Sequence, residues 1–143
     1  MKKVFIDTNI IVYARENDDL TKNKIANNLF KNELANKSIF ISVQVLNELY
    51  SSLTKHKVPH DEIAKLISDL QYDVQVSPIT TSLVNDALVL KKKYKYSWWD
   101  SLILASSLEN ECSTVYSEDM QDGQLIENTL TIRNPFVTQA VNS

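Results

Sequence analysis

Four acidic side chains stand where several carboxylates could act together. Asp7 directly follows a predicted strand at residues 2–6, and Asp119 lies just beyond another at 114–116. Asp100 falls in the first turn of a predicted helix. Glu48 lies in a helix that follows the predicted strand at residues 38–41. In parallel sheets, ligands bind outside the carboxyl ends of the strands. We therefore expect these four carboxylates to gather at one edge of a sheet.

Grouped carboxylates favour a divalent cation. Like charges in close proximity repel one another unless protons or cations intervene. Oxygen ligands suit Mg²⁺, Mn²⁺ or Ca²⁺ better than Zn²⁺ or Cu²⁺, and Mg²⁺ completes its shell with water and substrate phosphate oxygens. Two such ions about 3.5–4 Å apart would clamp the attacking and leaving oxygens of a phosphodiester displacement. The predicted cofactor is Mg²⁺ (or Mn²⁺), and the predicted chemistry needs no His base and no Ser or Cys nucleophile.

Each acid also has a simpler interpretation when taken alone. Asp7 could cap a helix, Asp100 suits the positive end of a helix dipole, and Asp119 is a common turn residue. Glu48 could be a solvated residue of an amphipathic helix. The metal-site hypothesis therefore depends on their convergence.

The composition excludes several other kinds of site. The 143 residues include one glycine, Gly123, so neither a dinucleotide-binding fingerprint nor a Walker loop can be written. One cysteine, Cys112, excludes a disulfide framework and a site with several thiolates. Two histidines cannot build a His-rich metal site by themselves. Metal chemistry in this chain must depend on carboxylates.

Short β-rich runs alternate with helical stretches along the chain. Strands are predicted at residues 2–6, 38–41, 73–76, 114–116 and 129–132. Helices are predicted from Thr8 onward and at residues 19–34, 42–55, 60–70, 80–93 and 97–108. Alternation of this kind predicts a three-layer α/β/α fold with a short, mainly parallel central sheet of four to five strands.

Four motifs resemble the PIN domain, a metal-dependent ribonuclease fold. The run Val4-Phe5-Ile6-Asp7-Thr8-Asn9 resembles its opening acidic motif, and Glu48 matches the second acid. Trp99-Asp100-Ser101 matches the third acid, and Ser117-Glu118-Asp119 the fourth, in a form common in one bacterial branch. Asn134-Pro135-Phe136 closes many members of that branch, so the resemblance runs from Lys3 to Phe136.

The resemblance implies a single PIN-like domain over residues 1–136, with a short C-terminal tail at 137–143. It implies Asp7, Glu48, Asp100 and Asp119 as catalytic and metal-binding acids. It also implies that Thr8, Asn9 and Ser117 support these acids by hydrogen bonding.

One position departs from the family pattern. Many members carry a further acid two residues after the fourth, where this chain has Gln121. Asp122 comes one residue later. It is therefore either a supporting acid, acting through water, or a turn residue, and the turn interpretation is the preferred one.

The resemblance further implies an endoribonuclease that cleaves RNA with metal-activated water. Small bacterial members are often the toxin half of a type II toxin–antitoxin pair of the VapBC type, dimerise, and are silenced by a cognate antitoxin. The expected partners are thus RNA, an antitoxin and a second copy of the chain. With no membrane span or export signal predicted, the expected location is the cytoplasm.

The net charge of −3 does not by itself suggest a nucleic-acid binder. A basic run before Asp100 nevertheless offers phosphate contacts at Lys92, Lys93 and Lys95, and Arg15 offers another. Aromatic residues in the same run could stack on unpaired bases. The competing interpretation is a solvated helix end with lysines favoured by the dipole and at least one tryptophan in the core.

Two other functions fit parts of the pattern. A PIN-fold module without catalysis would bind only protein partners, and intact acids disfavour it. A phosphatase with an Asp nucleophile would use Asp7, but such enzymes normally have a second Asp where this chain has Asn9.

Overall fold

A mainly parallel sheet runs through the middle of the molecule. The computed structural model describes residues 2–36 and 38–137. The strands are β1 (Val4–Ile6), β2 (Ile39–Ser42), β3 (Gln75–Ser77), β4 (Thr114–Tyr116), β5 (Leu125–Ile126) and β6 (Leu130–Arg133). They lie in the order β3-β2-β1-β4-β6-β5, and each pairing is parallel except that of β5 with β6.

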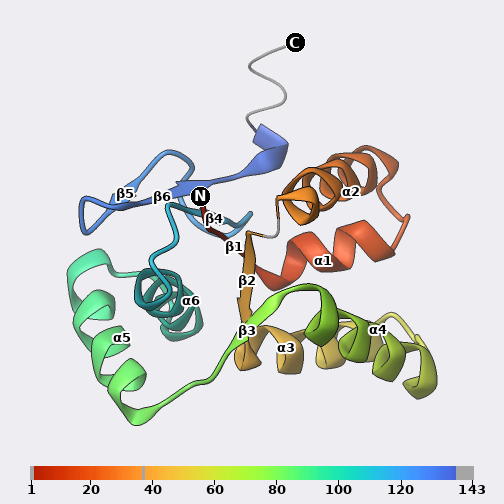
Figure 1. The fold of residues 1–143 in the computed structure, drawn as a ribbon, viewed down its shortest axis with the longest axis horizontal. Coiled ribbons are helices and arrows are strands. Elements are labelled where there is room, and N and C mark those ends of the chain that lie inside the picture. The colour runs from red at the N-terminus through yellow and green to blue at the C-terminus, as the bar shows by residue number, and fades with distance from the viewer. Residues whose placement is uncertain (1, 37, 138–143) are drawn as a thin grey trace.

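Helices cover both sides of this sheet, as predicted. They are α1 (Thr8–Arg15), α2 (Leu20–Ala35), α3 (Val43–Lys55), α4 (His60–Asp73), α5 (Thr81–Tyr94) and α6 (Trp98–Glu109). Figure 1 shows α1 and α2 on one side of the central strands and α5 and α6 on the other. Helix α3 packs against α1 and α4. The predicted α/β class with a mainly parallel sheet is confirmed.

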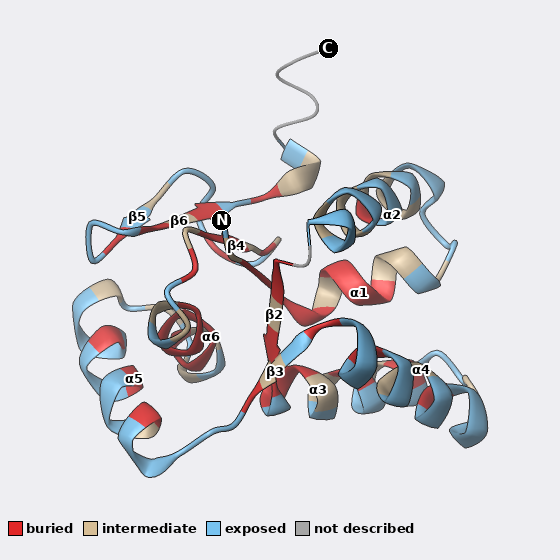
Figure 2. Ribbon diagram, in the orientation of Figure 1, coloured by how far each residue is buried: buried red, intermediate tan, exposed pale blue. Residues whose placement is uncertain are grey.

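The core centres on β1 and α6 (Figure 2). All three residues of β1 are apolar and fully buried, as expected for a strand that helices cover on both faces. Helix α6 is buried continuously from Ser101 to Ser107. Its buried residues are leucine, isoleucine, alanine and small serine side chains, and a helix without a charged face in this stretch belongs in the interior. These two buried elements carry Asp7 and Asp100 at their ends.

The sheet has six strands where four to five were predicted. Strand β5 was missed because it has only two residues and reaches β6 through a turn at Glu127 and Asn128. Both have left-handed backbones, with φ of 49° and 62°. Glycine commonly marks such a hairpin turn, and this turn has none.

Several boundaries also differ from the prediction by one to three residues, most at the end of α4. Helix α4 runs three residues further than expected, to Asp73, so β3 begins at Gln75. Residues 138–143 of the expected tail lie outside the described residues. In the part of the chain that the structure describes, no helix has both the length and the apolar character to cross a membrane.

Candidate metal centre

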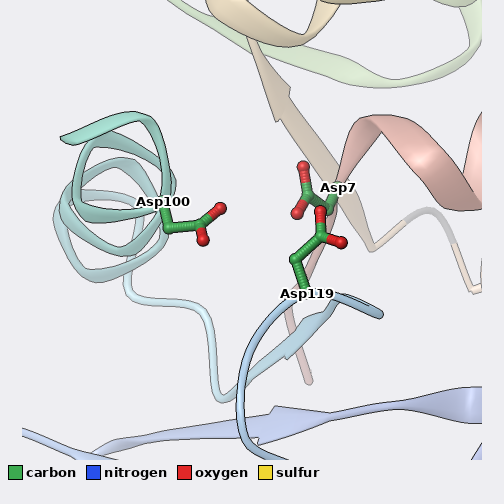
Figure 3. A group of neighbouring side chains, drawn as sticks. All are labelled: Asp7, Asp100 and Asp119. Carbon is green, nitrogen blue, oxygen red and sulfur yellow. The ribbon is translucent and has the colours of Figure 1, made fainter. Parts of the chain in front are cut away.

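Three carboxylates converge at the carboxyl edge of the sheet. Asp7 follows β1 and caps α1, while Asp119 lies in the loop after β4. Strands β1 and β4 are parallel neighbours, so their ends share one edge. Asp100 reaches the same place from the first turn of α6. Figure 3 shows the three side chains around a common space, and one oxygen of each lies within 4.8 Å of the other two.

Glu48 lies beside this group rather than within it. It projects from α3 and lines a pocket of about 150 Å³ together with the three aspartates. Its Oε1 accepts a hydrogen bond of 2.8 Å from the Thr8 hydroxyl. The structure thus places all four predicted acids on one pocket, with three of them close enough to share a cation.

Thr8, Asn9 and Ser117 all donate hydrogen bonds to the acids. The Ser117 hydroxyl donates to Asp7 Oδ2 at 2.9 Å, and the Asn9 amide donates to Asp119 Oδ2 at 3.0 Å. The Thr8 backbone N–H donates to Asp7 Oδ1 at 2.8 Å, while its hydroxyl holds Glu48. These bonds fix the carboxylates in place without neutralising them.

Burial and repulsion between like charges raise the pKa values of the three aspartates. Asp7 is 5% exposed, and burial raises its pKa from 3.8 to about 7 against the lowering effect of hydrogen bonds from Ser117 and Thr8. Asp100 and Glu48 raise it slightly further.

Burial also raises the pKa of Asp100, with repulsion from Asp119 as the next cause. The pKa of Asp119 is raised by burial and by neighbouring Glu118. A bound divalent cation would reverse this by favouring the ionised form of all three aspartates.

Asp122 lies outside the acidic pocket. Its Oδ1 accepts a hydrogen bond of 2.8 Å from the backbone N–H of Asn134. Asp122 therefore ties the loop after β4 to the end of β6. This contact agrees with the interpretation of Asp122 as a turn residue.

None of the predicted phosphate-binding cations lines the acidic pocket. Arg15 pairs with Glu16 and Glu62, and Lys93 pairs with Glu127. Lys92 and Lys95 are exposed, and no ion pair involves either one among residues 2–36 and 38–137.

Sequence reasoning missed a polar cluster behind Asp119. Glu118 accepts hydrogen bonds from the Tyr13 hydroxyl at 2.8 Å and from the Lys22 ammonium group. The Lys22 ammonium lies 4.8 Å and 5.2 Å from the ring centroids of Tyr13 and Phe136. The cluster joins α1, α2 and the segment at Phe136 to the Asp119 loop. The position of Glu118 within the Ser117–Asp119 motif was the available signal.

The donor set fits a hard cation. Aspartate oxygens suit Mg²⁺ and Mn²⁺, and Mg²⁺ is usually held by few carboxylates because it retains water. Asp7, Asp100 and Asp119 are the residues able to hold such an ion, with Glu48 at its margin. A cation held there could present a water and a phosphate to each other.

Comparisons with known proteins identify the family and the fold of this chain. The sequence profile of the PIN domain matches residues 4–121. No curated protein sequence matches the chain. A toxin–antitoxin complex from Klebsiella pneumoniae has a similar fold, with a TM-score of 0.66 and 18% identity over 93% of this chain and 98% of the other.

Two further solved structures share the fold. VapC20 from Mycobacterium tuberculosis, a toxin that cleaves the sarcin-ricin loop, has a TM-score of 0.60 and 22% identity over 79% of this chain and 87% of its own. VapBC2 from Rickettsia felis, bound to a DNA fragment from its promoter, has a TM-score of 0.65 and 19% identity, covering 92% and 98%. With its profile match spanning all four acidic positions, this chain belongs to the PIN domain family.

Proposed function

We propose that this chain is an endoribonuclease that hydrolyses RNA phosphodiester bonds with Mg²⁺ or Mn²⁺. The observation that carries the proposal is the convergence of Asp7, Asp100 and Asp119 to within 4.8 Å. Membership of the PIN family supports it, and so does the fold shared with a toxin that cleaves an RNA loop. The bound ion would activate water and neutralise charge on the phosphate.

The chain's own residues would hold and orient this site. Ser117 and Thr8 fix the two oxygens of Asp7, and Asn9 fixes Asp119. Asp7 is 5% exposed, and both of its oxygens accept hydrogen bonds, which favours a ligand over a phosphatase nucleophile. Glu48, held by Thr8, lies on the pocket wall where it can accept a proton or orient water. Lys92 and Lys95 are the proposed phosphate contacts.

We assign the protein to the toxin half of a type II toxin–antitoxin pair. The support is its fold, shared with a toxin–antitoxin complex at a TM-score of 0.66 and with VapBC2 at 0.65. The proposed partners are a cognate antitoxin and a second copy of this chain. With RNA as the proposed substrate, the proposed location is the cytoplasm.

RNA cleavage by the purified chain tests this proposal. Structured and unstructured RNAs would be incubated with Mg²⁺, Mn²⁺ or EDTA, beside the variants Asp7→Asn and Asp100→Asn. Asp122→Asn is the matched control, because Asp122 bonds a backbone N–H outside the acidic pocket. We expect cleavage that needs metal, disappears in the first two variants and survives in the control. Cleavage that persists in Asp7→Asn and Asp100→Asn would overturn the site assignment.

A further inference from the structure

A second pocket adjoins the acidic one. It has a volume of about 430 Å³, and Ile79, Trp99 and Leu102 contribute apolar surface to its lining. Glu48 lines both pockets, and Trp99 directly precedes Asp100. A charged pocket suited to metal and phosphate therefore shares a wall with an apolar pocket. We call the second one the Trp99 pocket.

Trp99 leaves most of its surface in solvent. Its neighbour Trp98 packs against the hydrophobic core, whereas Trp99 is 59% exposed at the first turn of α6. A large aromatic side chain left in solvent at the rim of an apolar pocket is typical of a surface that binds something.

Gln44 joins the helices that form the wall between the two pockets. It is 5% exposed and lines the Trp99 pocket. The amide nitrogen donates to the carbonyl oxygen of Trp99 at 3.1 Å and to Glu48 Oε2 at 3.4 Å. Its amide oxygen is buried and has no hydrogen-bond partner among residues 2–36 and 38–137. The two bonds of the amide nitrogen tie the start of α6, where Trp99 lies, to α3, where Glu48 lies.

We propose that the Trp99 pocket binds an unpaired RNA base next to the phosphate in the acidic pocket. The proposal rests on the proposed function, which supplies RNA as the ligand. A nucleotide joins an anionic phosphate to a flat aromatic ring that carries N–H donors. The paired pockets offer a cation site for the phosphate and the exposed Trp99 ring for the face of the base.

Stacking on Trp99 would contribute affinity for RNA that attraction between opposite charges does not supply. The chain has a net charge of −3, and carboxylates crowd the site, so general electrostatic attraction to RNA is weak. Base stacking on an aromatic side chain contributes about 1–3 kcal/mol and does not depend on charge. A duplex keeps its bases stacked on each other, so the pocket selects single-stranded RNA or loops.

The test is a binding titration that needs no cleavage. A fluorescently labelled uridine decamer, and a strand of the same length whose residues lack bases, would be titrated with the full chain in Ca²⁺ and followed by anisotropy. The variants are Trp99→Ala and Trp99→Phe. Tyr72→Ala is the matched control, because Tyr72 is an aromatic residue that is 91% exposed and lines neither pocket.

We expect Trp99→Ala to weaken binding of the decamer about tenfold or more. Trp99→Phe should retain most of the affinity, and Tyr72→Ala should match the unmodified chain. The unmodified chain should prefer the decamer to the abasic strand, and Trp99→Ala should lose that preference.

A preference for bases that persists in Trp99→Ala would overturn the proposal. If that variant also changes from dimer to monomer, measured by sedimentation, the pocket is an interface between copies of the chain. Failure of the nuclease proposal is separate: Trp99-dependent base preference without cleavage in any metal would support the pocket and refute the enzyme.

Discussion

We predict that burial of the ionised Asp7 carboxylate destabilises the metal-free protein. Burial raises the pKa of Asp7 from 3.8 to about 7, so the folded chain holds this proton more tightly than the unfolded chain does. Stability must then fall as pH rises from about 4 to about 7, and level off above that. At about 1.36 kcal/mol per pKa unit, the loss reaches about 4 kcal/mol.

Replacing Asp7 with Asn should remove this loss. The amide oxygen can still accept from the Thr8 N–H, and the amide nitrogen can donate to the Ser117 hydroxyl. We expect Asp7→Asn to stabilise the metal-free chain at pH 8 by up to about 4 kcal/mol, and by about half as much at pH 5.5.

Urea unfolding in EDTA, followed by tryptophan fluorescence at both pH values, measures the effect. Asp86→Asn is the control, because Asp86 is exposed, and it should change stability by less than about 0.5 kcal/mol. Added Mn²⁺ should stabilise the unmodified chain and not Asp7→Asn. The reasoning is refuted if Asp7→Asn is less stable than the unmodified chain at pH 8, or if its advantage is equal at both pH values.

Other substitutions probe the supports of the site. Ser117→Ala removes a hydrogen bond that lowers the pKa of Asp7, so Mn²⁺ binding should weaken at pH 7 and recover at pH 9. Calorimetric titration at both pH values measures this, and equal affinity of the variant and the unmodified chain at pH 7 would contradict it. Tyr13→Phe removes the hydrogen bond to Glu118 and keeps the ring, so we expect a loss of about 1 kcal/mol in urea unfolding, and no loss would mean that the cluster is not stabilising. Leu104→Ala empties a fully buried position in α6 and should cost about 2–5 kcal/mol by the same method, whereas a cost below about 1 kcal/mol would contradict the assigned core.

Local sequence signals were sufficient for the elements that carry the acids. Asp7 directly follows the apolar run of β1, and Ser97 caps the helix that bears Asp100. Short stretches of sequence therefore indicate the end of β1 and the start of α6. Alternation of strands and helices predicts a parallel sheet, whose strands end at one edge. That β1 and β4 are neighbours in this sheet is seen in the structure. Convergence of the acids could therefore be expected before any coordinates were available.

Features that depend on long-range contacts could not be predicted in this way. Strand β5 exists because two residues pair with β6, and nothing in its own sequence requires a strand. Glu118 acquires a role only because α2 brings Lys22 beside it. The orphaned oxygen of Gln44 likewise depends on how α3 meets the start of α6.

The most direct test of the central claim is calorimetric titration of the full chain with Mn²⁺ at pH 8. If Asp7, Asp100 and Asp119 form one cation site, the unmodified chain binds Mn²⁺, and Asp100→Asn and Asp119→Asn each lose affinity by about tenfold or more. Asp122→Asn should bind as the unmodified chain does. Equal affinity in the unmodified chain and Asp100→Asn would show that these carboxylates do not hold the metal.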